Sequence, residues 1–134
     1  MIQLDFTGAT KGKFRSPQKD QALNMDGAKN SIVRARIKRG SGSDWAGRLY
    51  WNGKSKSDPV VLYEEAGGRA LIIDEPVGLD NKFVTVEWDM SVIPEWNESL
   101  INQIRIDFEN SGAAATYYVN WIEIGGTVSV KYED

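Results

Sequence analysis

Apolar and polar residues alternate along much of this chain with a period of two. The clearest example lies in residues 101–125, where Ile104, Ile106 and Phe108 alternate with polar neighbours; the segment 31–39 repeats the pattern. Such alternation is typical of a strand with one buried and one solvated face. Residues 101–125 therefore predict two strands joined by a short Ser-Gly-Ala connection. A second layer must cover their apolar face.

Similar short segments, separated by turn-forming residues, recur from one end of the chain to the other. Asn52-Gly53 predicts a tight turn, and 94–100 is the only helix-like segment, too short for a structural helix. We expect about nine strands, at 2–6, 31–39, 45–51, 59–63, 70–74, 82–90, 101–109, 117–124 and 127–132, with a weaker candidate at 22–25.

These strands predict an all-β fold, a two-sheet antiparallel β-sandwich (jelly roll) with no substantial helix. The length of 134 residues fits one domain, 1–134. Within it we expect an irregular N-terminal strand and basic loop at 1–30 and the sandwich core at 31–132. The polar stretch 7–20 contains Gly and Pro and shows no alternation, so we interpret it as a loop or an irregular edge.

The charges are distributed unevenly behind a net charge of -3. Residues 1–56 contain 12 Lys and Arg and 4 Asp and Glu, whereas residues 57–134 contain 4 and 15. A basic first half can indicate a nucleic-acid surface. The alternative is that strands of the two halves lie side by side and their charges pair. We favour pairing, and expect no nucleic-acid partner, because the basic residues are spread over loops and strands.

The absence of His and Cys removes the usual general base, thiol catalysis and the common zinc ligands. Paired acids occur at Asp74-Glu75, Glu87 with Asp89, and Asp107 with Glu109. Glycosidases use two carboxylates across a cleft, but paired acids also abound on solvated strand faces. We therefore expect no enzymatic activity and no bound cofactor.

A polar face is the best candidate for recognition. Alternation places several Arg, Tyr, Gln and acidic side chains, including Glu87, on the solvated side of their strands, and aromatic residues join them if the last long strand buries Tyr118, Ile122 and Ile124. Planar hydrogen-bonding groups beside aromatic rings are typical of sugar-binding sites; a ladder of ion pairs is the alternative. The candidate ligand-binding residues are Arg34, Arg36, Arg48, Tyr50, Gln103, Arg105, Asp107, Tyr117 and Trp121.

Two further groups of residues have alternative roles. Trp45 and Trp96 lie at loop edges, where they either form exposed stacking platforms or, as we favour, plug the ends of the core. Oxygen-bearing side chains suit calcium. The candidate calcium ligands are Asp107, Asn110 and Ser111, with Asp5 or Asp26.

Several motifs occur in the order found in one family. They are RLYW at 48–51, VEWDM at 86–90, Trp96, INQIRIDFEN at 101–110 and YYVNWIEIG at 117–125. In this order the chain resembles carbohydrate-binding-module-like jelly-roll domains of the galactose-binding-like group. The family's strand motif "lRiD" corresponds to residues 104–107, and its motif "iDwI" to 119–122, with Asn120 in place of the usual acid. Its opening motif keeps Asp5-Phe6 but has Phe14-Arg15 where a Trp is common.

The resemblance implies a non-catalytic domain, as members of this group usually are. Such domains accompany glycan-degrading enzymes and also occur in bacteriophage virion proteins. Family members often hold a structural calcium ion. Two functions follow as hypotheses: a glycan-binding module, and a structural virion protein such as a capsid decoration (cement) or tail component. The basic region 11–19 fits the second, since it can become ordered against an acidic neighbouring subunit.

The expected partners are accordingly a glycan or neighbouring virion subunits, and homo-oligomerisation stays open. No apolar run is long enough for a membrane span. Met1 is followed directly by a strand-like segment and not by a signal-peptide pattern. We expect the domain to act on a virion or outside the cell.

Overall fold

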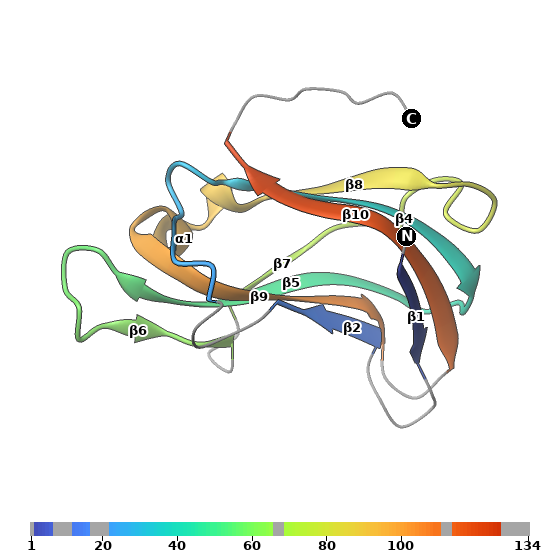
Figure 1. The fold of residues 1–134 in the computed structure, drawn as a ribbon, viewed down its shortest axis with the longest axis horizontal. Helices are drawn as coiled ribbons and strands as arrows, with labels where there is room; N and C mark the ends of the chain where they lie inside the picture. The colour runs from blue at the N-terminus through green and yellow to red at the C-terminus, as the bar shows by residue number, and fades with distance from the viewer. Residues whose placement is uncertain (1, 7–11, 17–21, 66–68, 111–113, 127–134) are drawn as a thin grey trace.

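The computed structural model describes residues 2–6, 12–16, 22–65, 69–110 and 114–126. It confirms the predicted fold class: two antiparallel sheets, of four and six strands, are layered against each other as a β-sandwich (Figure 1). The helical elements of the described part are short, namely the 3-10 turn η3 (Met90–Val92) and α1 (Pro94–Asn97), besides a single 3-10 residue at Glu65. The helical turn expected at 94–100 is therefore confirmed.

The four-stranded sheet has the strand order β1-β10-β4-β8, all neighbours being antiparallel. Its central strands, β10 and β4, are far apart in sequence but pair along most of their length. The strands are β1 (Ile2–Phe6), β10 (Ala115–Gly125), β4 (Ile32–Ser41) and β8 (Val84–Asp89).

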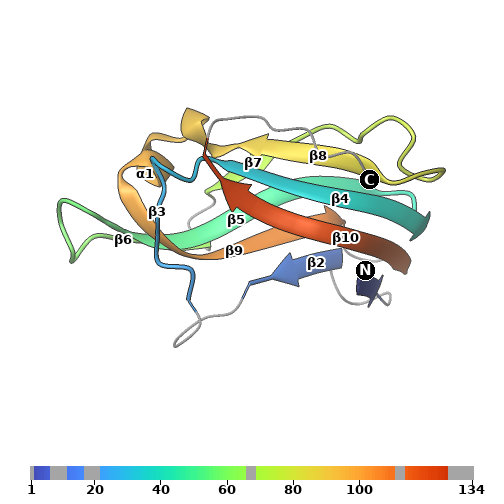
Figure 2. The ribbon, with the colours of Figure 1, turned by 45° about the horizontal axis from the view of Figure 1, so that its top comes forward.

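The six-stranded sheet is built around two long central strands, β9 and β5. Two short strands, β2 and β3, pair with the outer edge of β9, and two others, β6 and β7, pair with the outer edge of β5. Figure 2 shows this layer beneath β4 and β10. The strands are β2 (Gly12–Arg15), β3 (Met25–Asp26), β5 (Trp45–Ser55), β6 (Leu62–Tyr63), β7 (Ala70–Ile72) and β9 (Ser99–Glu109).

The apolar positions of the alternating strands form the core between the sheets. From β4 these are Val33, Ala35 and Ile37, and the apolar residues of β9 face them from the other sheet. Burying such side chains is the main stabilisation of the fold, on the order of 1.5–3 kcal/mol for each large one. The predicted core of residues 104–108 and 122–124 is confirmed, with Ile122 and Ile124 half-buried at its edge.

Trp45 and Trp96 pack at the core, as favoured from the sequence, and Trp88 lies within it. Trp96 is fully buried, and its Nε1 donates to the carbonyl of Gly27 at 3.0 Å. Trp88 is also fully buried and donates to the carbonyl of Gly47 at 3.1 Å. Trp45 is half-buried, with its Nε1 bonded to the carbonyl of Ile73. Each buried indole N–H named here therefore has an acceptor.

One prediction about local structure was wrong. Asn52-Gly53 is not a turn, because β5 runs through it to Ser55 and pairs with β9 on both sides. In the stretch 7–20, interpreted as a loop or an irregular edge, residues 12–15 form the edge strand β2, whose pairing with β9 is irregular between Gly12 and Lys13. The strand expected at 127–132 lies outside the described residues, as do residues 11 and 17–19 of the basic region 11–19.

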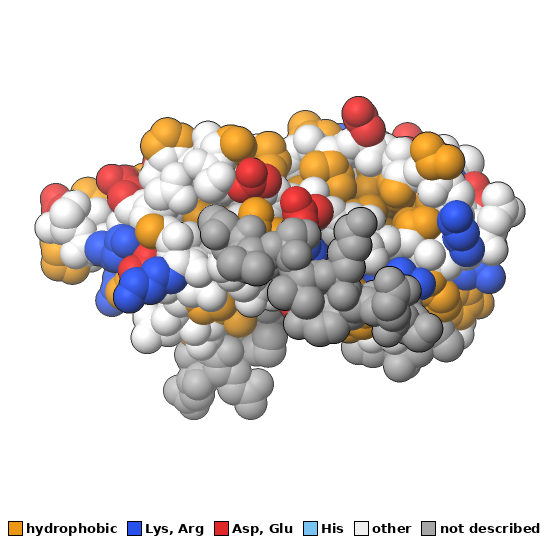
Figure 3. All heavy atoms as spheres, turned by 90° about the horizontal axis from the view of Figure 1, so that it is seen from above, with side chains coloured by type: hydrophobic (Ala, Val, Ile, Leu, Met, Phe, Trp, Pro, Cys, Tyr) orange, Lys and Arg blue, Asp and Glu red, His pale blue; other side chains and the backbone are white. Residues whose placement is uncertain are grey.

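Cross-strand pairing of charges between the two halves of the chain is confirmed. Arg34 on β4 contacts Glu87 at 2.8 Å and Glu123 at 3.5 Å, and Arg15 contacts Glu65 at 2.6 Å. On the outer side of the four-stranded sheet, basic and acidic side chains are interspersed and do not form one field (Figure 3). None of the described helices has the length and apolar character of a membrane span.

Candidate functional site

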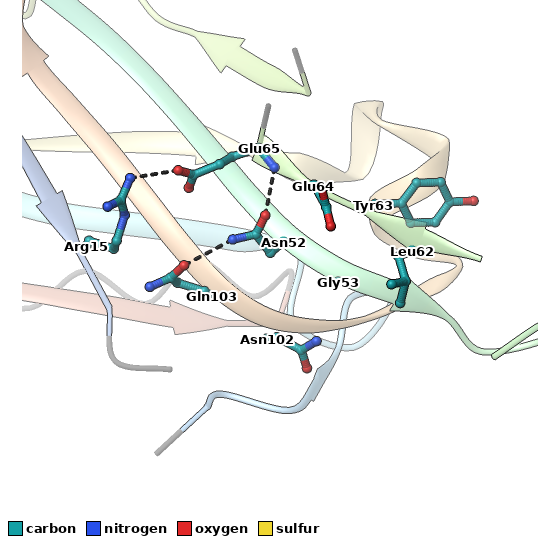
Figure 4. Close-up of a pocket in the computed structure, with 9 residues that line it drawn as sticks. All are labelled: Arg15, Asn52, Gly53, Leu62, Tyr63, Glu64, Glu65, Asn102 and Gln103. Atoms are coloured by element: carbon teal, nitrogen blue, oxygen red, sulfur yellow. Dashed lines mark hydrogen bonds and ion pairs between the residues drawn. The ribbon is translucent and has the colours of Figure 1, made fainter. Parts of the chain in front are cut away.

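A polar groove of about 470 Å³ lies on the outer side of the six-stranded sheet. Neighbouring positions of β5 and β9 form its floor, β2 contributes one side, and β6 with the two residues after it forms the opposite wall (Figure 4). The lining residues are Arg15, Asn52, Gly53, Leu62, Tyr63, Glu64, Glu65, Asn102 and Gln103.

Two amide side chains at the floor hold the groove together. Asn52 and Gln103 are directly opposite each other in the β5–β9 register, and Asn52 Nδ2 donates to Gln103 Oε1 at 3.0 Å. Asn52 Oδ1 accepts from the backbone N–H of Glu65 at 2.7 Å, and Gln103 Nε2 donates to the carbonyl of Ser16 at 2.6 Å. Through these two hydrogen bonds the Asn52–Gln103 pair connects both walls of the groove, at Glu65 and at Ser16, to strands β5 and β9.

A β-bulge brings Asn102 to the same groove. The register passes from Asn52–Gln103 to Gly53–Ile101, so Asn102 is an extra residue on β9. A bulge re-aims side chains and reverses the alternation on either side of it. This explains why Ile101 and Ile104 are both buried although they are three residues apart.

Glu65 is the charged centre of the groove. Its Oε1 accepts from Arg15 at 2.6 Å and from Arg105 at 3.1 Å. Its Oε2 is buried and has no hydrogen-bond partner in the described part of the chain. A buried carboxylate oxygen without a donor is unfavourable, and the two guanidinium groups on Oε1 offset part of this cost.

Tyr63 supplies the aromatic edge. The centroid of its ring lies 5.7 Å from that of Trp51, and the Arg69 guanidinium carbon lies 4.8 Å from the Tyr63 centroid. The Tyr63 hydroxyl donates to the Glu98 carboxylate. The hydrogen bond to the Glu98 carboxylate raises the pKa of Tyr63 above its usual value, because ionisation would place two negative charges together. The ring is therefore held in place from three sides.

The candidate residues from the sequence fall into separate places. Arg34 and Arg36 are on β4 of the four-stranded sheet, where they bond Glu87 and Thr85. Trp121 pairs with Arg36 in register and lines an apolar pocket at the edge of the sandwich. The six-stranded sheet carries Arg48, Tyr50, Gln103, Arg105 and Asp107. The predicted single polar face is thus divided between the two sheets.

The interpretation of Tyr117 as a member of the polar face is wrong. Tyr117 is fully buried and stacks on Phe108 with ring centroids 5.3 Å apart, whereas Tyr118 is only half-buried. The register of β10 against β4 shifts by one residue at Asn120. Because of this bulge, the buried side changes from odd- to even-numbered residues along the strand.

Of the five candidates on the six-stranded sheet, only Gln103 lines the groove. Arg105 lies beside the groove. Its guanidinium group is 4.2 Å from the centre of the Tyr50 ring and donates to both carboxylate oxygens of the buried Asp107. Arg48 donates to Asn110 Oδ1 at 2.8 Å. These side chains form a polar network that supports the groove.

The proposed calcium ligands are engaged otherwise. Asp107 pairs with Arg105, and Asn110 bonds Arg48 and Asp44. Among the described residues, no three acidic side chains gather closely enough to hold a metal ion. Ser111 lies outside the described residues.

Sequence reasoning missed a buried charged cluster at the other end of β9. Glu109 is fully buried and accepts from Tyr117 Oη at 2.7 Å and from the backbone N–H of Asp44 at 2.9 Å. Arg39 lies 3.6 Å from Glu109 and bonds both carboxylate oxygens of Asp80. Burial, followed by the bond to Glu109, raises the pKa of Tyr117. This cluster fastens the ends of the two sheets to each other.

Most groove residues were also missed, namely Arg15, Asn52, Tyr63, Glu65 and Asn102. Continuing the alternation of Leu49 and Trp51 past residue 51 places Asn52 on the outer face, but the Asn-Gly dipeptide was interpreted as a turn. The other four need the strand order and the bulge, which no local pattern contains.

Comparison with known proteins adds no assignment to this geometry. No family model, no curated protein and no solved structure matches the chain.

Proposed function

We propose that the protein is a non-catalytic glycan-binding domain whose ligand lies in the polar groove of the six-stranded sheet. The observation that carries this proposal is the lining of the groove, in which the side-chain amides of Asn52, Asn102 and Gln103 lie around one hollow beside the Glu65 carboxylate. Amides both donate and accept hydrogen bonds, as vicinal sugar hydroxyls require.

The dimensions and charge of the groove favour a short neutral saccharide. Small-molecule sites are on the order of 300–1,000 Å³, and the groove measures about 470 Å³. Its acids, Glu64 and Glu65, are balanced by Arg15 and by Arg105, which pairs with Glu65. Tyr63 and Leu62 supply an apolar edge for the C–H groups of a sugar ring.

The ion pairs of the groove carboxylate Glu65 suit a binding site better than a hydrolytic active site. Glu65 is held in ion pairs by two guanidinium groups, whereas a glycosidase places two carboxyl groups on either side of the scissile bond. The acid pairs noted in the sequence have other partners: Asp107 bonds Arg105, Glu87 bonds Arg34, and Asp89 caps η3.

The test is a glycan array followed by titration of the strongest ligand into wild-type protein and two variants. We expect binding with a Kd on the order of 0.1–1 mM, about -4 to -5.5 kcal/mol. Asn102→Ala should weaken it at least tenfold, because this half-buried amide lines the groove. Asn81→Ala, in an exposed turn, is the matched control and should leave it unchanged. Folded protein that binds no glycan on the array refutes the proposal.

A second candidate is a structural virion protein, either a capsid decoration or a tail component. It is favoured by consecutive exposed apolar residues at the tip of the β5–β6 hairpin, Val60, Val61 and Leu62. Contiguous exposed apolar side chains mark protein contacts more often than sugar sites. Specific self-association without glycan binding would favour this function over the first.

A further inference from the structure

An apolar pocket of about 260 Å³ lies at the side of the sandwich where β1 and β2 approach β10. β1 pairs with β10 only up to Val119, and beyond it no described strand pairs with this edge of β10. The bulge at Asn120 adds to the irregularity, so the edge is not sealed. All but one of the lining residues are apolar: Leu4, Phe14, Val119, Asn120, Trp121 and Ile122.

The size of this pocket suits aliphatic side chains. A closed cavity of about 150 Å³ with an apolar lining is large enough for benzene, and this pocket is larger and open to the outside. Water gains few hydrogen bonds in such a lining, because Asn120 is the only polar side chain among the described residues that form it. An apolar group that fills the pocket would therefore displace poorly bound water.

The same chain presents a matching apolar tip. The β5–β6 hairpin projects from the body of the sandwich (Figures 1 and 2). At its turn Val60 is 83% exposed and Leu62 is 61% exposed, with Val61 between them. Single exposed apolar residues are ordinary, but three in sequence on a projecting turn indicate a contact surface.

The tip projects away from the strands that line the pocket, so a tip cannot fill the pocket of its own chain. The hairpin lies at the left in both views, whereas β1 lies at the right and β2 between them. Their surroundings also differ in charge. Lys54 is paired with Leu62 in the β5–β6 register and forms no ion pair among the described residues, and Asp5 next to the pocket bonds only the neutral groups of Gln3 and Thr116 in that part of the chain.

We propose that copies of this chain associate head to tail, with the Val60–Leu62 tip of one copy inserted into the pocket between β1, β2 and β10 of the next. Apolar burial drives the contact, and attraction between Lys54 and Asp5 orients it. Such an interface is heterologous, since different surfaces meet, and it leaves a free tip and a free pocket at the two ends. The association therefore extends to chains of copies, and its small area makes it weak.

The test is sedimentation velocity of wild-type protein and variants over a concentration series from about 10 µM to 1 mM, the range of weak association. The wild type should show a weight-average mass that rises steadily with concentration. Val60→Asp damages the tip, and Asn120→Lys places a positive charge at the pocket; each should remain monomeric. The control is Val77→Asp, at a valine that is 94% exposed elsewhere, and it should associate like the wild type.

Mixing the two monomeric variants gives the decisive result. Val60→Asp retains an intact pocket and Asn120→Lys an intact tip, so the mixture should form one-to-one dimers and nothing longer. A mixture that stays monomeric overturns the proposal, as does a wild type that is monomeric at every concentration. Neither variant changes a residue of the glycan groove, so this outcome is independent of the proposed function.

Discussion

The outer faces of the two sheets come from similar alternating sequences but have different properties. On the four-stranded sheet, Arg34 pairs with Glu87, whose side chain is 46% exposed. On the six-stranded sheet, Arg105 pairs with Asp107, which is 1% exposed, and Gln103 is 3% exposed. Covering strands and loops, rather than alternation, therefore decide whether a polar strand face becomes a set of solvated ion pairs or a buried network.

The free energies should differ in the same way. Exposed ion pairs contribute at most about 1 kcal/mol. Removing one member of a buried pair costs about 3–5 kcal/mol, because an uncompensated charge stays behind. The network on the six-stranded sheet is therefore expected to hold the groove rigid, whereas the ladder on the other sheet mainly keeps that face soluble.

The largest effect is expected for Asp107→Ala. It leaves Arg105 with Glu65 as its remaining carboxylate partner in the described network, so we expect a loss near the lower limit, about 3 kcal/mol of unfolding free energy. Urea denaturation measures it, and Asp107→Asn, which keeps the shape, should lose less. A loss for Asp107→Ala below about 1 kcal/mol would place this pair with the exposed ones.

Gln103→Ala is expected to lower the free energy of unfolding by a smaller amount, about 2 kcal/mol. The substitution leaves Asn52 Nδ2 and the carbonyl of Ser16 without their partner, and buried groups without hydrogen bonds cost about 1–3 kcal/mol. The comparison on the other face is Thr85→Ala, which removes an exposed bond to Arg36. Equal losses for the two variants in urea denaturation would contradict the proposed difference between the faces.

Glu87→Ala should lower the free energy of unfolding by less than about 1 kcal/mol. Arg34 keeps Glu123 at 3.5 Å as a second partner, which reduces the loss further. Thermal unfolding in low salt and in 1 M NaCl measures the effect, since the screening length falls to about 3 Å in 1 M salt. A loss that is large and independent of salt would show that this face is not a solvated ladder.

The smallest effect concerns pH and the rim of the groove. The Glu98 carboxylate raises the pKa of Tyr63, so the unfolded chain ionises first and stability falls as the pH rises past the unfolded value of about 10. Ultraviolet titration of Tyr63→Phe against wild type isolates this tyrosine. Glu98→Gln should bring the pKa of Tyr63 back toward 10, and an unchanged titration in that variant would mean that Glu98 is not the cause.

The sequence was informative where strands are regular and misleading where they are interrupted. Val33, Ala35 and Ile37 alternate without a break, and their burial was predicted correctly. In β10 the bulge at Asn120 changes which alternate residues are buried, so Tyr117 was predicted on the wrong side of the strand. An extra residue in one strand is defined by its partner strand, and a single alternating pattern does not contain that information.

The groove was harder to predict than the fold for a related reason. Its residues come from β2, β5, β6 and β9, which are adjacent only through the strand order. Gln103 was identified because it lies on a clearly alternating strand. Arg15 was not, because β2 does not alternate, and Asn52 was hidden within an apparent turn signal. Residue types can suggest sugar recognition, but their assembly depends on tertiary contacts.

The most direct test of the central claim is an NMR titration with the best glycan from the array, following the side-chain amides of Asn52, Asn102 and Gln103 and, on the opposite face, Arg34 Nε. Because the proposed site is the groove, we expect saturable shifts for the three amides at one common Kd and none for Arg34. Shifts confined to Arg34 and its neighbours, or amides that do not respond while the glycan binds, would contradict the proposed site.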